Sequence, residues 1–177
     1  MTQTALPLER TPAATRAIRG PLLTFVGDPF QRGLGETMRY EPDAIVAIEQ
    51  RRITQVGAAT KVRRVLPPST EVERYGNDSL IMAGFIDCHV HFPQIPIIGA
   101  GDAQLLDWLE KYTFVAEQRF EQPKHARDVA RVFLRERLRN GVTTSAVHCT
   151  VHSASVDALF KEALALGLRT IAGKVLM

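Results

Sequence analysis

Cysteine is scarce in this chain, and this scarcity limits the classes of protein to which the chain can belong. Only Cys88 and Cys149 occur among 177 residues, and no CxxC motif is present. Two isolated cysteines exclude a disulfide framework and a cysteine-rich metal finger. Both cysteines fall in segments with a strand pattern, so we interpret them as small buried residues of a protein in a reducing compartment.

Long apolar runs are also missing. No segment approaches the roughly 18 apolar residues of a membrane span. The segment 1–20 mixes arginine and proline and lacks the continuous apolar stretch of a signal peptide. We therefore expect no membrane association and a cytoplasmic location.

Aromatic residues make up 7% of the chain, and its net charge is only +3. The lysines and arginines are scattered and are not interleaved with aromatic side chains, as a surface that stacks nucleic-acid bases would require. We expect no nucleic-acid partner. The remaining composition, 45% hydrophobic and 23% charged, is typical of a soluble globular protein with one or two small domains.

The first part of the chain predicts a small all-β unit. We expect a flexible tail over residues 1–20 and a β domain over 21–79. Short apolar runs bounded by glycine, proline and asparagine predict its strands. The expected strands cover 21–27, 44–49, 52–56 and 62–66, with a loop over 28–42.

From Leu80 onward the pattern alternates between strand and helix. Strands are expected from Leu80, over 142–151 and over 169–177, and helices over 103–120, 123–140 and 153–166, the last capped by Ser153 and Gly167. Such alternation predicts βαβ units and a parallel sheet. A complete (β/α)₈ barrel needs about 250 residues. Residues 80–177 therefore predict the first strands of a barrel in a truncated chain, or else a small open sheet.

The phrase Gly84-Phe-Ile-Asp-Cys-His-Val-His91 is the most informative feature of the sequence. An apolar run predicts a buried strand from Leu80 to Ile86. Histidines at positions i and i+2 of a strand lie on one face. His89 and His91 can thus bind one divalent metal at the strand's carboxyl end. The alternative is two histidines that serve packing, and Asp87 is expected to give a supporting hydrogen bond.

Three further polar residues follow strand ends. Gln94 lies three residues after His91, and its amide both donates and accepts hydrogen bonds, as recognition of a purine edge requires; an ordinary surface glutamine is the alternative. His148 and His152 are four residues apart, which is about 13 Å along a strand. We therefore do not expect them to share a metal, although His152 could form a polar wall of the site.

These residues carry a resemblance to a known family. Met82 to His91 resembles the first-strand signature of the amidohydrolase superfamily, P-G-[FL]-[IV]-D-x-H-x-H, with Ala83 in place of proline. Leu106 to Phe120 is similar to the guanine deaminase phrase W-L-x-x-Y-T-F-P-x-E-x-R-F, with Val115 in place of its proline. The segment 140–144 resembles the strand N-G-[TV]-T-T of the same enzymes.

The resemblance implies an α/β fold: the first strands of a TIM-type amidohydrolase barrel over 80–177, preceded by the N-terminal part of a small β-sandwich over 21–79. It implies one Zn²⁺ per active site, held partly by His89 and His91, and a water activated by that metal that converts guanine to xanthine and ammonia. Gln94 matches the glutamine that contacts the purine. The family's general acid/base and metal-binding aspartate would lie beyond Met177, so we expect this piece to be inactive alone.

Several alternatives stay open. The chain could belong to a sister enzyme that acts on another aminated heterocycle, such as a pterin, a triazine or an adenosine-type compound. It could also be a non-catalytic binding module that kept a metal-type strand. The metal could be iron rather than zinc. For the complete enzyme we expect a small-molecule purine as substrate and a homodimer.

Overall fold

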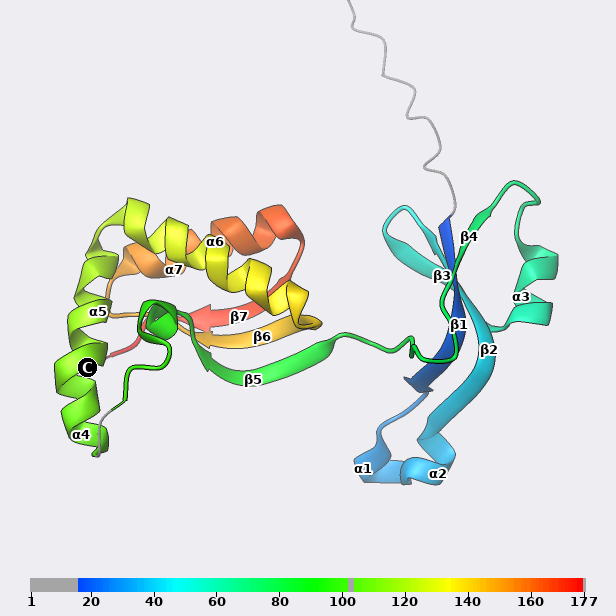
Figure 1. Ribbon diagram of the computed structural model, residues 1–177, viewed down its shortest axis with the longest axis horizontal. Helices are drawn as coiled ribbons and strands as arrows, with labels where there is room; N and C mark the ends of the chain where they lie inside the picture. Colours follow the sequence, from blue (N-terminus) through cyan, green and yellow to red (C-terminus); the bar gives the residue numbers. More distant parts are fainter. Residues whose placement is uncertain (1–15, 102–103, 177) are drawn as a thin grey trace, which may run out of the picture. The chain divides into compact units, whose positions relative to one another are not determined.

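The computed structural model describes residues 16–101 and 104–176, and the chain divides into two compact units, Met1–Ala83 and Gly84–Met177 (Figure 1). Of the tail expected over 1–20, residues 1–15 lie outside the described part. Residues 16–20 belong to the first strand, so the expected tail is too long by at least five residues.

The first unit is built on a four-stranded sheet in the order β3-β2-β1-β4. The pairs β1–β2 and β2–β3 are antiparallel, and β1–β4 is parallel. Its strands are β1 Arg16–Phe25, β2 Met38–Glu49, β3 Arg52–Ala58 and β4 Glu71–Arg74. Three short helices connect them: α1 Pro29–Arg32, α2 Leu34–Thr37 and α3 Ala59–Val65. Whether this unit is part of a β-sandwich stays a prediction.

Two expectations for the first unit are wrong. The run 62–66 was expected as a strand, but it belongs to α3 and its end. Ala59, Val62 and Leu66 have helical spacing and pack together against the sheet, so burial on one helical face decides the conformation. The expected loop 28–42 contains α1, α2 and the start of β2. The Asp28 side chain caps α1 by accepting from the Phe30 amide at 2.8 Å.

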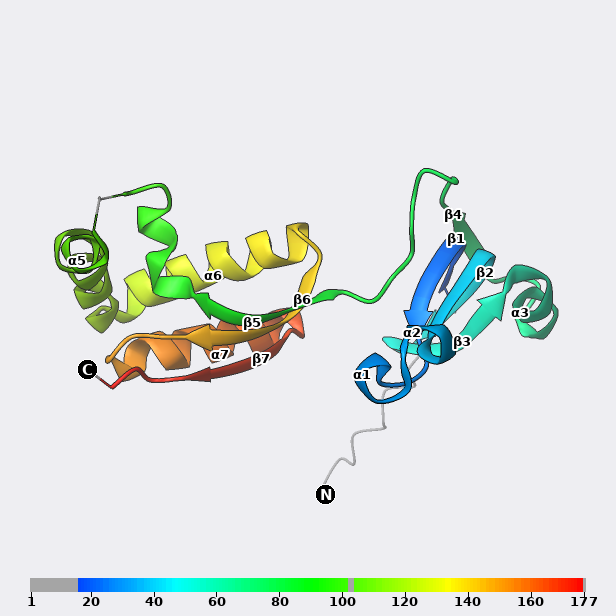
Figure 2. The ribbon, with the colours of Figure 1, turned by 90° about the horizontal axis from the view of Figure 1, so that it is seen from below.

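The second unit holds a parallel sheet in the order β5-β6-β7, as the alternation of strands and helices predicts. Its strands are β5 Phe85–His91, β6 Val142–His148 and β7 Arg169–Gly173, and its long helices are α6 Pro123–Arg139 and α7 Ser153–Leu166. Figures 1 and 2 show both helices on the same face of the sheet. Gly167 ends α7 in the left-handed conformation, with φ 69°, as its position predicts.

The connection from β5 to α6 is more broken than the single helix expected over 103–120. It contains a 3₁₀ helix Phe92–Ile97, α4 Leu105–Trp108, a π-helical turn Leu109–Thr113, α5 Phe114–Gln118 and a 3₁₀ turn Arg119–Glu121. Single π turns are often found beside functional sites. None of the described helices is long and apolar enough to cross a bilayer.

The core of the second unit lies between the sheet and its helices. Phe92, Phe120 and Phe133 are completely or almost completely buried there. On β6, Ser145 and Val147 face the helices and are buried, while Ala146 between them faces the open side. The helices thus cover one face of the sheet, and the other face stays accessible.

The strand expected to be buried over 80–86 is largely exposed, and it begins only at Phe85. Ile81 instead forms a bridge with Leu22 of β1. β5 pairs with β6 on one side only and lies at the edge of the described sheet, which explains why Ile86 is 69% exposed. For the same reason Cys88 is exposed, contrary to expectation, whereas Cys149 is buried and its pKa is raised by burial to about 12.

This open face predicts self-association of the 177-residue chain. Exposed apolar side chains on an unpaired sheet edge promote contacts between molecules. Ile86 and Ile171 are each 69% exposed on the open side, and we expect the double replacement Ile86→Thr, Ile171→Thr to shift the chain toward monomer. Sedimentation velocity at several concentrations measures this. Ile98→Thr, at a 77% exposed loop position, is the control and should change nothing; a monomeric parent chain would contradict the prediction.

Candidate metal centre

Two imidazoles meet at the carboxyl end of β5. The Nε2 atoms of His89 and His91 are 3.2 Å apart, and their ring centroids are 5.2 Å apart. The i, i+2 spacing predicts this convergence, although the strand is exposed and not buried. His89 is exposed and His91 is half-buried.

A third imidazole, that of His148, joins them from β6; the sequence analysis did not expect it to share a metal with His152 and did not place it among the ligands. The parallel register pairs His91 with His148, and the His148 ring lies 4.5 Å from the His91 ring and 4.6 Å from the His89 ring. One ligand atom from each of the three histidines lies within 4.8 Å of the others. The overlooked signal is that His148 also ends a parallel strand, and the ends of neighbouring parallel strands meet at one edge.

A bulge in β5 helps to aim His89. Asp87 pairs with Ser145 and Val90 with Val147, so Cys88 and His89 together stand opposite a single residue of β6. Bulges leave a backbone group unpaired and often re-aim a side chain beside an active site. The Asp87 carboxylate accepts from the freed His89 amide at 3.0 Å.

Asp87 is itself held from the helix layer. Arg137 on α6 donates to its second carboxylate oxygen, in an ion pair whose side chains are 20% and 29% exposed. The pKa of Asp87 is lowered, first by the His89 amide and then by Arg137, against the effect of burial. Asp87 thus connects α6 to the backbone of the bulge, which is the supporting hydrogen bond expected from the sequence.

The spacing of the three histidines fits a divalent metal, and so does the lowered pKa of His91. Two imidazole nitrogens bound tetrahedrally at about 2.1 Å lie about 3.4 Å apart, close to the 3.2 Å between His89 and His91. Burial, followed by the neighbouring imidazoles of His148 and His89, lowers the pKa of His91. A lowered pKa favours the neutral imidazole, which is the form that binds metal.

Gln94 lies in the 3₁₀ helix that follows His91 and is half-buried. The pKa of Glu117 on α5 is raised by burial, and the Gln94 side chain acts on it in the opposite direction. Glu117 is only 8% exposed, and it lines a pocket of about 340 Å³ together with Phe114, Gln118, Val151 and His152. Sequence reasoning gave Glu117 no role in the site, because the contact between α5 and the 3₁₀ helix that holds Gln94 joins segments more than twenty residues apart.

His152 stands apart from the three-histidine group among the described residues and lines this pocket instead. It precedes α7 at a turn fixed by hydrogen bonds. Ser155 Oγ donates to the His152 carbonyl at 2.7 Å, and the His152 amide donates to Thr150 Oγ1 at 3.1 Å. Ser155, not the expected Ser153, therefore orders the start of the helix.

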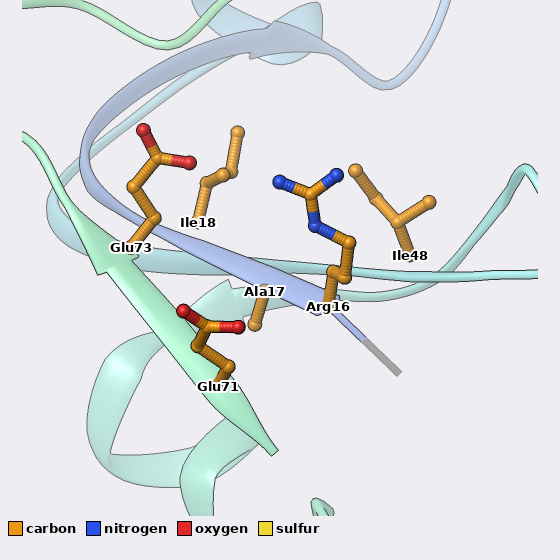
Figure 3. Close-up of a pocket in the computed structure, with 6 residues that line it drawn as sticks. All are labelled: Arg16, Ala17, Ile18, Ile48, Glu71 and Glu73. Carbon is orange, nitrogen blue, oxygen red and sulfur yellow. The ribbon is translucent and has the colours of Figure 1, made fainter. Parts of the chain in front are cut away.

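A second pocket of about 340 Å³ belongs to the first unit (Figure 3). Arg16, Ala17 and Ile18 of β1 line it with Ile48 of β2 and two carboxylates of β4, Glu71 and Glu73. None of these described lining residues is a histidine or a cysteine. The candidate metal centre is thus a feature of the second unit.

Comparison with known proteins agrees with this geometry. The sequence profile of the amidohydrolase family matches residues 80–177, which include all three histidines. The chain belongs to the amidohydrolase family. Among characterised members of this family, the guanine deaminase of Escherichia coli (strain K12) is 37% identical over 92% of the chain. The probable guanine deaminase of Deinococcus radiodurans is 32% identical over 89% of it.

Solved structures of amidohydrolases share the fold. The E. coli guanine deaminase superposes with a TM-score of 0.82 at 37% identity and covers 92% of this chain. The guanine deaminase of Bradyrhizobium japonicum gives a TM-score of 0.81 at 31% identity over 90% of it. These likenesses confirm the predicted fold class. The chain spans 37% and 36% of the lengths of the E. coli and D. radiodurans relatives.

Proposed function

We propose that this chain contributes the first strands and part of the active site of a guanine deaminase, which hydrolyses guanine to xanthine and ammonia. The observation that carries the proposal is the position of Gln94, a residue suited to a purine edge, three residues after a histidine of the candidate metal centre. The 37% identity to the E. coli guanine deaminase supports guanine as the substrate.

We propose His89, His91 and His148 as ligands of one Zn²⁺. Imidazole donors suit zinc and also iron, so metal analysis decides between them. A bound divalent cation would lower the pKa of a water ligand toward neutrality and so supply a nucleophile for hydrolysis. Asp87 and Arg137 keep the bulge of β5 in place, and through it the direction of His89.

Gln94 would orient the substrate. Its carboxamide can meet the adjacent carbonyl and N–H groups of guanine, and a site with such hydrogen bonds rejects ligands that leave its buried polar groups unpaired. We assign no proton-transfer role to a described residue. A homodimer, a cytoplasmic location and the absence of nucleic-acid and membrane partners stay predictions.

The test is a substrate panel assayed on the protein as its gene encodes it, with any residues that follow Met177. Ammonia release is measured with guanine, adenine, adenosine, a pterin and an aminated triazine, and xanthine is measured as the second product with guanine. Turnover of guanine above all others supports the proposal. Preference for another heterocycle favours the sister enzyme, and metal binding without turnover of any compound favours the binding module.

Replacement of Gln94 by alanine is expected to lower kcat/KM for guanine by about 5- to 150-fold, which corresponds to the roughly 1–3 kcal/mol cost of an unpaired buried polar group. Zinc content should not change, because Gln94 is not a proposed ligand. Steady-state kinetics and metal analysis of the same preparations measure both quantities. Gln104→Ala, on an exposed loop, is the control. If Gln94→Ala acts on guanine as well as the parent does, the recognition role is wrong.

A further inference from the structure

Arg137 is a largely buried cation in the last turn of helix α6. It donates a hydrogen bond to the Asp87 carboxylate of β5, and its side chain is 20% exposed. Its guanidinium lies over the ring of Phe133, with Cζ 5.7 Å from the ring centroid, and Phe133 is itself 1% exposed. A core aromatic ring and a carboxylate of the sheet thus hold Arg137 in one place.

Stability alone explains the ion pair between Arg137 and Asp87 poorly. The Nε atom of Arg137 is buried and has no hydrogen-bond partner among the described residues, and an unpaired buried donor lowers stability. The cost of withdrawing two charges from water offsets much of their attraction, so apolar residues of similar volume often serve a fold equally well. What the pair orients is therefore the better guide to its role.

The pair acts on the part of β5 that the sheet fixes least. At the bulge, Cys88 and His89 together face one residue of β6, so regular ladder hydrogen bonds do not set the direction of His89. The His89 amide instead donates to Oδ1 of Asp87 at 3.0 Å, and Arg137 donates to Oδ2 of the same carboxylate. A carboxylate held at both oxygens cannot rotate freely, so Arg137 restricts the backbone of His89 through Asp87.

We propose that Arg137 is a positioning residue of the metal centre, and that it couples the packing of α6 on the sheet to metal binding at His89. This inference rests on the proposed ligands His89, His91 and His148. It deepens that proposal by assigning an effect on metal affinity to a helix residue that supplies no ligand atom. Because such coupling is reciprocal, the bound metal must in turn stabilise α6.

Charge and positioning predict opposite effects for the removal of Arg137. A cation near a bound metal ion repels it, so loss of the charge by itself would strengthen metal binding. Loss of an outer group that holds a ligand in place weakens metal binding, typically 10- to 100-fold. Arg137→Met keeps much of the volume and the apolar contact but removes both the charge and the donor. We expect it to weaken binding by about tenfold, at the low end of that range, because Arg137 acts through Asp87 and the backbone.

The first arm of the test titrates the metal-free protein, as its gene encodes it, with Co²⁺. Co²⁺ absorbs visible light in bands that depend on its coordination geometry, so one titration measures both affinity and geometry. Arg137→Met should weaken Co²⁺ binding about tenfold and change these bands. Arg137→Lys keeps a donor cation and should restore most of the affinity. Arg137→Gln, which is neutral and shorter but polar, repeats the test if the methionine variant does not fold.

Arg131→Met is the matched control for this arm. Arg131 also lies on α6, and it pairs with Glu162 of α7 at 2.9 Å rather than with β5. Its replacement removes the same charge and the same kind of ion pair from the same helix. We expect the affinity for Co²⁺ and the absorption bands to stay unchanged.

The second arm measures the reciprocal effect, by hydrogen exchange of α6 with and without Zn²⁺. The metal should slow exchange in the last turns of α6 in the parent and in Arg131→Met, but not in Arg137→Met. This measurement does not depend on catalysis. Each variant is compared with itself, so a general loss of stability does not imitate the expected result.

The outcomes separate this inference from the proposed metal centre. Weaker Co²⁺ binding in Arg137→Met together with lost protection of α6 supports the inference. Unchanged or tighter binding in Arg137→Met, equal weakening in Arg131→Met, or metal protection of α6 that survives in Arg137→Met overturns it, while the centre itself stands. A parent that binds no Co²⁺, or that binds it as well after His91→Ala, refutes the centre, and the inference falls with it.

Discussion

Replacement of His91 by alanine is expected to remove the bound metal and the activity together. His91 lies close to both other histidines of the group: its Nε2 atom lies 3.2 Å from that of His89, and its ring stacks on that of His148 with the centroids 4.5 Å apart. Loss of even an outer hydrogen bond to a metal ligand typically lowers metal affinity 10- to 100-fold, and loss of the ligand itself costs more. We expect metal content to fall from about one ion per chain to less than about a tenth of that.

The measurement is elemental analysis after dialysis against a weak chelator, on the 177-residue chain and on the protein as its gene encodes it. His125→Ala is the matched control, because His125 lies on α6 against Phe120 and outside the three-histidine group. His148→Ala separates two hypotheses about the third imidazole. If His148→Ala loses as much metal as His91→Ala does, His148 is a ligand. If His148→Ala keeps all of its metal, His148 is a packing partner of His91. Full metal retention in His91→Ala would rule out this centre.

The order of elements in the second unit could be predicted because the signals are local. The spacing of apolar residues on α6 and α7, the glycine after α7 and the β-branched run of β6 each depend on neighbours in sequence. The prediction of a strand over 62–66 is wrong because a short apolar segment fits a strand or a helix equally well. Packing against the sheet decides between the two conformations. The π turn over 109–113 has no comparable local signal.

The residues of the candidate site also fall into those that local sequence predicts and those that depend on contacts between distant segments. His89 and His91 follow from a two-residue spacing on one strand. The place of His148 depends on the register between β5 and β6, and the burial of Glu117 depends on how a 3₁₀ helix meets α5. The sequence analysis considered only the distance from His148 to His152 along the same strand. The neighbour that matters, His91, lies on the adjacent strand. Contacts between elements far apart in sequence are what a single sequence leaves undetermined.

The aromatic cluster behind the histidines should have the largest effect on stability. Phe92 follows His91 directly and is completely buried; its ring meets Phe120 edge-on at 5.3 Å and lies 5.9 Å from Phe133. Truncation of a buried phenylalanine to alanine removes its apolar contacts and leaves a cavity, at a cost of about 3–5 kcal/mol. We expect Phe92→Ala to lower the free energy of unfolding of the second unit by that amount.

Trp108 is the one tryptophan of the sequence and belongs to the second unit, so its fluorescence during urea unfolding reports on this unit. Phe160→Ala makes the same change on α7 at a position that is 41% exposed, and it should cost less than half as much. Because Phe92 lies between His91 and Gln94, its loss should also loosen both and weaken metal binding. If Phe92→Ala costs under about 1 kcal/mol, the cluster does not anchor this segment, and the histidines depend on the β5–β6 pairing alone.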